Sequence, residues 1–158
     1  MRLSEIAEFV VEEYPDCCMA SNNVVSKGCR EDWYEEYLID ELMDFFSFEI
    51  MDMCGCGCPE LTYELIRRIL NIRADKYNNK LTYEETIQRY KNDLDLDDDN
   101  DNQSGALQFI LYMLDSKGIV EHGSSIGGCW LSKLGEMYLT VLNAWHEQEE
   151  KREEDNAN

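Results

Sequence analysis

The sequence predicts a mainly α-helical protein with one small β-hairpin near its C-terminal end. Apolar residues over 31–53 recur with the 3.6-residue period of an α-helix. A second helix-length apolar stretch, 104–117, is followed by two short β-type segments, 119–121 and 129–131, which flank a glycine-rich stretch. The chain has 158 residues, of which 44% are apolar, so it can bury a real core and is not a disordered acidic polymer.

The N-terminal half has two predicted helices separated by a loop. The segment 3–14, "LSEIAEFVVEEY", gathers its apolar residues on one face, and Pro15 ends it. Residues 16–30 are rich in Cys, Asn, Ser and Gly, which is typical of a loop. The helix over 31–53 is expected to bury one apolar face, made of Tyr34, Leu38, Leu42, Phe45 and Phe46.

Two more helices are predicted in the middle of the chain. Pro59 is suited to the first position of a helix that runs to about residue 73. Thr82 and Glu85 have the spacing of a capping box and begin another helix. The tetrapeptide "LTYE" occurs at 61 and again at 81, and we treat this repetition as chance. Residues 93–103 are an acidic, low-complexity loop.

The C-terminal part is predicted to be a helix, the hairpin and a closing helix. The helix over 104–117 is apolar almost all round and should be buried, with Gly118 as its C-cap. Glycines 123, 127 and 128 would supply positive φ values at the hairpin tip. We expect Trp130 to be largely buried and Ser132 to cap a helix that ends at Trp145.

These elements predict four regions. The order is an N-terminal helical region (1–92), an acidic loop (93–103), a helix–hairpin–helix (104–146) and a charged, disordered tail (147–158). No apolar run has the length of a membrane span and no export signal is present, so the sequence predicts a soluble intracellular protein.

The charge of the chain restricts its partners. The formal net charge is -20, with a net of -11 over 1–58, +2 over 59–92 and -11 over 93–158. Binding to phosphates requires Lys and Arg, which only the middle segment supplies. The acidic remainder instead suits a basic surface, such as the nucleic-acid groove of another protein.

The C-terminal motifs resemble those of winged-helix domains over about forty residues. The matching pieces, "MLDSKGIVEHG", "SSIGG", "CWLS" and "KLGEMYL", follow one another from Met113 to Leu139. The resemblance implies a helix that enters the DNA groove, followed by a β-hairpin wing. This chain departs from that pattern because the helix offers little beyond Gln103, Gln108 and Lys117 for contacting DNA. We therefore do not expect DNA binding.

A second resemblance, to small uncharacterised proteins of bacteriophages and prophages, covers about half of the chain. It rests on "CGCGCPE" at 54–60 and on the segment from Leu111 to Glu136. It implies a viral protein acting in the cytoplasm of a bacterial host cell. Its sharpest version is an inhibitor of the anti-CRISPR type.

Two groups of acidic residues are the candidate partner-binding site. Residues of the 31–53 helix at i, i+4 spacing form an acidic stripe, and the acidic loop supplies a second group. Together they are Glu36, Asp40, Asp44, Asp95, Asp97, Asp98, Asp99 and Asp101. They would present carboxylates where a basic channel normally receives phosphates.

The cysteines suggest a third kind of site. Cys54, Cys56 and Cys58 are candidate zinc ligands, although the C-x-C-x-C spacing is unlike the usual C-x-x-C knuckle. The alternative is a loop of small thiols beneath a helix start. The Asp run does not fit a calcium-binding EF-hand, because neither Asp95 nor Asp97 as first residue places Gly at position 6.

Three functions remain open from the sequence. The first is an acidic, phage-encoded interaction protein that inhibits a host nucleic-acid-binding defence factor, such as a CRISPR effector, by nucleic-acid mimicry. The second is a winged-helix transcriptional regulator that binds DNA through the basic 67–91 segment. The third is a metal- or redox-responsive cysteine protein. We expect no enzymatic activity, because no catalytic motif is present, and no cofactor apart from the candidate zinc. The sequence leaves the oligomeric state open.

Overall fold

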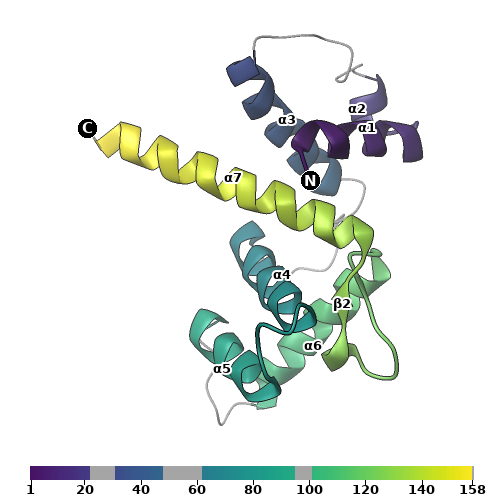
Figure 1. The fold of residues 1–158 in the computed structure, drawn as a ribbon, viewed down its shortest axis with the longest axis vertical. Coiled ribbons are helices and arrows are strands. Elements are labelled where there is room, and N and C mark those ends of the chain that lie inside the picture. The colour runs from purple at the N-terminus through teal and green to yellow at the C-terminus, as the bar shows by residue number, and fades with distance from the viewer. Residues whose placement is uncertain (22–30, 48–61, 95–100, 158) are drawn as a thin grey trace. The chain divides into compact units, whose positions relative to one another are not determined.

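A computed structural model of the chain describes residues 1–21, 31–47, 62–94 and 101–157. The fold is mainly helical, with a two-stranded antiparallel hairpin before the last helix, as the sequence predicts (Figure 1). The chain divides into two compact units. One consists of residues 1–57 together with 140–158, and the other of residues 58–139.

The first unit contains α1 (Leu3–Glu13), α2 (Cys18–Ser21) and α3 (Glu31–Phe45). The start of α1 is capped by Glu5, whose carboxylate accepts a 2.8 Å hydrogen bond from the backbone N–H of Arg2. The predicted apolar face of α1 is buried through Ile6, Ala7 and Val10. The prediction of a loop over 16–30 is wrong at α2, while residues 22–30 lie outside the described part of the chain.

The helix α3 places its predicted apolar face in the core of this unit. Leu38, Leu42, Phe45 and Phe46 are buried, and the Phe45 ring contacts Tyr14 edge-on at a centroid distance of 5.1 Å. The Tyr34 side chain and residues 48–53 lie outside the described residues. Residues 46 and 47 form a π-helical turn directly after α3.

The second unit begins with α4 (Tyr63–Tyr77) and α5 (Tyr83–Leu94), which pack against each other. Both copies of "LTYE" begin a helix in the same way. Thr62 and Thr82 each accept a backbone N–H three residues later, from Leu65 at 3.1 Å and Glu85 at 3.2 Å. Each copy therefore supplies the N-cap of a helix. The prediction that Pro59 begins α4 is wrong, because Thr62 is the N-cap.

The rest of this unit is α6 (Asp101–Ser116), β1 (Val120–Glu121), the short 3-10 helix η3 (Ile126–Gly128), β2 (Trp130–Leu131) and the start of α7 (Lys133–Ala157). The strands pair with Val120 opposite Leu131. α6 contacts β1 and η3, and α4 contacts β2 (Figure 1). The order of α6, the hairpin and α7 is the helix–hairpin–helix that the sequence predicts over 104–146.

Ser132 and Gly135 join the hairpin to α7. The Ser132 hydroxyl accepts a 3.0 Å hydrogen bond from Gly135 N–H, which confirms the predicted N-cap. Gly135 lies so close to β1 that a Cβ there would be 1.9 Å from the carbonyl oxygen of Ile119. The motif "KLGE" therefore needs its glycine for close approach between helix and strand.

Several details differ from the sequence predictions. The acidic loop is shorter than 93–103, because α5 includes residues 93–94 and α6 begins at Asp101. The tail is helical as far as Ala157, so the disordered tail predicted over 147–158 and the helix end at Trp145 are both wrong. Among the described residues, Gly118 is the only glycine with a positive φ, so the hairpin turns through η3 instead of a glycine-dependent tip.

One aromatic prediction is confirmed and another is wrong. Trp130 is largely buried, and its indole N–H donates to the carboxylate of Glu121, its cross-strand partner, at 3.2 Å. The helix α6 is not buried all round, since Phe109 and Tyr112 are more than half exposed. Within the described ranges, no helix combines the length and the apolar character needed to cross a membrane.

Candidate functional site

The acidic stripe predicted on α3 lies on the solvent face of that helix. Glu36, Asp40 and Asp44 are all exposed, while the opposite face is buried through residues such as Leu38 and Leu42. Residues four apart are about 6 Å apart along a helix axis, so the three carboxylates form one row. Packing of the apolar face stabilises α3, so the helix does not depend on the three carboxylates, and these can contact a partner.

More carboxylates of the first unit share this exposed, unpaired state than the sequence predicted. Eight exposed carboxylates in residues 1–21 and 31–47 form no ion pair with any residue that the structure describes: Glu8, Glu12, Glu13, Asp16, Glu35, Glu36, Asp40 and Asp44. In those two ranges Arg2 is the only cationic side chain, and it pairs with Glu5 at 3.1 Å. The unit as a whole contains 20 acidic and 5 basic residues, a net of -15.

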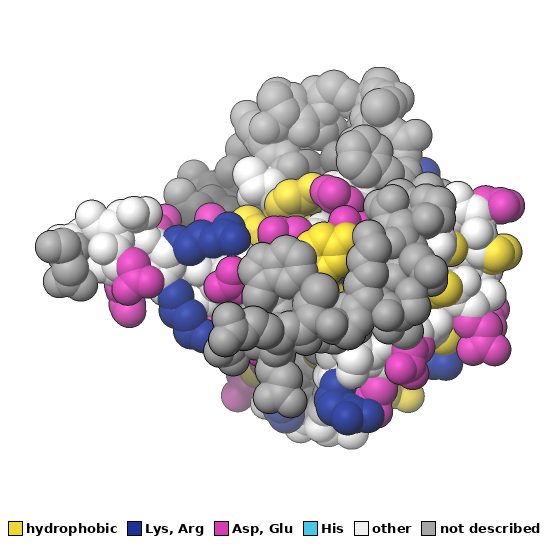
Figure 2. All heavy atoms as spheres, turned by 90° about the horizontal axis from the view of Figure 1, so that it is seen from above, with side chains coloured by type: hydrophobic (Ala, Val, Ile, Leu, Met, Phe, Trp, Pro, Cys, Tyr) yellow, Lys and Arg dark blue, Asp and Glu magenta, His cyan; other side chains and the backbone are white. Residues whose placement is uncertain are grey.

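On the face that Figure 2 views, the described acidic side chains do not form a single dense patch. Figure 2 shows Asp and Glu side chains spread over this face, with Lys, Arg, apolar and neutral side chains between them. A spread of this kind acts on a partner through the summed field of many charges more than through one contact. The surface is therefore suited to long-range attraction of a cationic partner.

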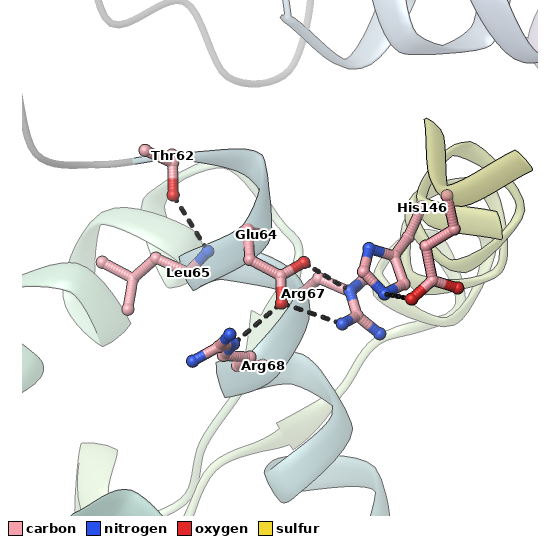
Figure 3. Close-up of polar contacts among 7 residues, drawn as sticks. Thr62, Glu64, Leu65, Arg67, Arg68 and His146 are labelled. Carbon is pink, nitrogen blue, oxygen red and sulfur yellow. Dashed lines mark hydrogen bonds and ion pairs between the residues drawn. The ribbon is translucent and has the colours of Figure 1, made fainter. Parts of the chain in front are cut away.

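In the second unit, two carboxylates of α4 are paired with cations. Glu64 on α4 accepts from Arg67 at 2.8 and 2.9 Å and from Arg68 at 2.8 Å (Figure 3). Asp75 pairs with Lys80 at 3.4 Å and with Arg89 at 3.2 Å. These pairs leave the α4–α5 segment with little unbalanced charge of either sign.

Arg73, the central cation of the predicted basic segment, is buried. It donates through Nη1 to the Gly127 carbonyl at 2.6 Å and through Nε to the Tyr90 hydroxyl, whose ring lies 5.0 Å from the guanidinium carbon. Burial raises the pKa of Tyr90 to about 12, and it also raises the pKa of the Cys129 thiol, while the Arg73 charge opposes both shifts. Arg73 therefore joins α4, α5 and the hairpin and does not reach solvent.

The face that would read DNA in a winged-helix domain has no basic side chain on α6. The exposed positions of this helix include Gln108, Phe109 and Tyr112, and residues 102–114 contain no charged side chain. On the hairpin, Glu121 is exposed and engaged by Trp130. Groove binding needs Arg or Lys at the phosphates, so the chemistry of a DNA reader is missing on these elements.

Part of the predicted site lies outside the described residues. Asp95, Asp97, Asp98 and Asp99 lie in 95–100, and Asp101 is placed only as the first residue of α6. The candidate zinc ligands Cys54, Cys56 and Cys58 lie in the range 48–61, which is not described either. Among described residues, no three His, Cys, Asp or Glu side chains are arranged to hold a metal ion.

The α3 row was predictable from the sequence, whereas the carboxylates of α1 were missed. Glu8 and Glu12 are four residues apart and lie on the side of α1 opposite Ile6 and Val10, so the helical period could have identified them. The exposed aromatic residues of α6 were missed as well, because apolar residues on every side of a helix indicate burial.

No family model matches this chain, and no significant match was found among curated proteins or solved structures.

Proposed function

We propose that this chain is an acidic interaction protein that occupies the nucleic-acid-binding surface of a basic partner protein. The observation that carries the proposal is the set of eight exposed carboxylates in the first unit that have no ion-pair partner in the described residues. A folded protein normally balances such charges, as the second unit does at Glu64 and Asp75. Unbalanced carboxylates on a stable helical scaffold are available to the cations of a partner.

The mechanism is competition for a basic channel. Exposed charges at the edge of an interface mainly raise the association rate, since their field steers the encounter. Carboxylates that follow a helix face at about 6 Å per step present repeated negative charge to Lys and Arg side chains that otherwise bind phosphates. A nucleic acid and this protein would therefore exclude each other from the partner.

The finer form of the proposal is a phage-encoded inhibitor of a host defence factor, with a CRISPR effector as its sharpest version. It rests on the resemblance of "CGCGCPE" and the Leu111–Glu136 segment to phage proteins, together with the acidic surface. The host defence factors in question hold nucleic acid in positively charged channels. Such a channel is the surface that the unpaired carboxylates fit.

The test is capture of partners from a bacterial lysate on the immobilised protein. A chain with a net charge of -20 also retains basic proteins non-specifically, as an ion exchanger does. The control variant must therefore lose the same amount of negative charge as the test variant. The test variant combines Glu36→Gln, Asp40→Asn and Asp44→Asn on α3. The control neutralises the same number of exposed carboxylates at the end of α7, with Glu147→Gln, Glu153→Gln and Asp155→Asn.

We expect a basic nucleic-acid-binding protein to be captured by the parent and by the control and to be lost with the α3 variant. Equal loss with both variants would mean ion exchange and would refute the proposal. The regulator alternative predicts instead that random duplex DNA is retarded in an electrophoretic shift assay, and that the shift weakens with salt. The internal pairing of Arg67, Arg68 and Arg89 and the burial of Arg73 favour the absence of such a shift.

A further inference from the structure

The helix α6 presents an uncharged stripe to solvent in a chain that is otherwise rich in charge. Every residue from 102 to 114 is uncharged, although 30% of the whole chain is charged. The exposed positions of α6 are spaced at three and four residues and so fall on one side of the helix. This α6 stripe consists of Gly105, Gln108, Phe109, Tyr112 and Ser116.

Two aromatic rings dominate the α6 stripe. Phe109 is 53% exposed and Tyr112 is 52% exposed. The Tyr112 ring contacts His122 of the hairpin edge-on at a centroid distance of 6.1 Å, so one of the two rings is held in place before any partner arrives. Neighbouring exposed rings on a regular helix lose little conformational entropy on burial and are typical of binding surfaces.

Charge selects the occupant of this surface. Two copies of a chain with a net charge of -20 repel each other over most of their surfaces, and most strongly at the first unit with its net of -15. The α6 stripe itself contains no charged residue, so two copies can meet along it with fewer like charges together than elsewhere; Asp115 beside the stripe is paired with His122 at 3.5 Å. A nucleic acid does not fit, because Asp101 begins the helix and no Lys or Arg lies along it to bind phosphates.

The stripe is also complementary to itself. When two α6 helices lie antiparallel with the midpoint of Phe109 and Tyr112 on the two-fold axis, Phe109 of one copy is opposite Tyr112 of the other, twice. The same register sets Gly105 opposite Ser116, so two small residues permit close approach at each end. Lys117, directly after the helix, comes within one turn of the Asp101 position of the second copy. The antiparallel helix dipoles add a favourable term.

We propose that the α6 stripe is the interface of an antiparallel homodimer of this chain. The interface is isologous, meaning that the same patch is used by both copies. A fully buried aromatic side chain covers about 150–250 Å², so the exposed halves of four rings contribute roughly 400 Å². A stable interface needs about 1,200 Å² or more, so the rings form the centre of a small, weak contact that dissociates on dilution.

The experiment is sedimentation equilibrium of the full chain over a wide range of concentrations. The expected mass changes from 18.5 kDa at high dilution to twice that value at high concentration. The variants Phe109→Glu and Tyr112→Glu each add a charge to the α6 stripe while keeping a good helix former. The matched control is Tyr83→Glu, which adds the same charge at an aromatic residue that is 67% exposed on α5. Far-UV circular dichroism verifies that each variant remains helical.

We expect each α6 variant to raise the dimer dissociation constant by at least about tenfold, and the control to change it by less than about twofold. A mass of 18.5 kDa at every concentration of the parent chain would overturn the proposal. So would a dimer that Phe109→Glu and Tyr112→Glu leave intact, or one that Tyr83→Glu weakens as much as they do. The outcome does not depend on the acidic surface of the first unit, so it stands or falls separately from the proposed function.

Discussion

Replacing Gly135 with Ala tests how the hairpin is joined to α7. In the native structure a Cβ at residue 135 would lie 1.9 Å from the carbonyl oxygen of Ile119 and 3.0 Å from its carbonyl carbon, whereas real Cβ atoms do not approach within 3.0 Å. The atom in the way belongs to backbone, so it cannot rotate aside. The helix start and β1 must therefore move apart.

The cost of that movement follows from the hydrogen bonds of the displaced carbonyl. Ile119 O accepts from Ser132 N–H at 3.1 Å and from the Ser132 hydroxyl at 3.1 Å. Losing both costs about 1 kcal/mol each, and repacking an overfilled contact adds about 1–3 kcal/mol. The higher helix propensity of Ala returns up to about 1 kcal/mol. The net expectation for Gly135→Ala is a loss of about 2–4 kcal/mol.

A thermal melt followed by circular dichroism measures this loss. For a unit of this size, about 2–4 kcal/mol corresponds to a fall in Tm of roughly 10–30 °C. The control is Gly105→Ala, because residue 105 is exposed in a helix and a Cβ added there would have no atom within 4 Å. Measured at high dilution, the control should melt at or slightly above the parent temperature. If Gly135→Ala melts like the control, the close contact between α7 and β1 is incorrect.

Three further predictions concern stability. Trp130→Ala should cost about 3 kcal/mol in denaturant unfolding, at the lower end of the range for a buried aromatic side chain, because Trp130 is largely but not fully buried; a loss below about 1 kcal/mol would contradict that placement. Raising the pH from 10 to 12 should remove up to about 2–3 kcal/mol, since Tyr90 ionises near its usual pKa of 10 when unfolded and only at about 12 when folded. Tyr90→Phe should reduce this alkaline dependence without removing it, because burial also raises the pKa of Tyr138 and that of Cys129; an unchanged slope would refute the role of Tyr90. Thr82→Ala should cost about 1 kcal/mol by removing the cap of α5, while Thr82→Ser should restore most of it.

Local signals in the sequence predicted the helices and the hairpin well. The capping box at Thr82, the C-cap at Gly118 and the N-cap at Ser132 are each confirmed, because every one depends on residues within three or four positions of each other. Boundaries were less predictable. The helix α7 continues to Ala157 through charged residues that form pairs within the helix, such as Arg152 with Glu149 at 2.7 Å. This segment contains few apolar residues and so was predicted to be a disordered tail, because a pattern of apolar residues does not reveal ion pairs within a helix.

The candidate site was predictable only in part. The exposure of Glu36, Asp40 and Asp44 followed from the helical period, since their positions are opposite the buried face of α3. The burial of Arg73 did not, because a cation in a basic segment reads as a surface residue until Tyr90 and Gly127 are brought to it from elsewhere in the chain. The exposure of Phe109 and Tyr112 could not be predicted either. When apolar residues surround a helix, the sequence does not show which side the core covers.

Competition between this protein and nucleic acid for the captured partner is the decisive test of the proposed mimicry. The immobilised partner is loaded with the protein, and the partner's own RNA or DNA is then added at constant ionic strength, so that release cannot be attributed to salt screening. If the carboxylates of α3 stand in for phosphates, nucleic acid displaces the parent protein and the α7 control at similar nucleic-acid concentrations, whereas the α3 variant Glu36→Gln/Asp40→Asn/Asp44→Asn does not load on the partner even when nucleic acid is absent. Simultaneous binding of the protein and the nucleic acid to one partner molecule would show that the two do not share a site and would rule mimicry out.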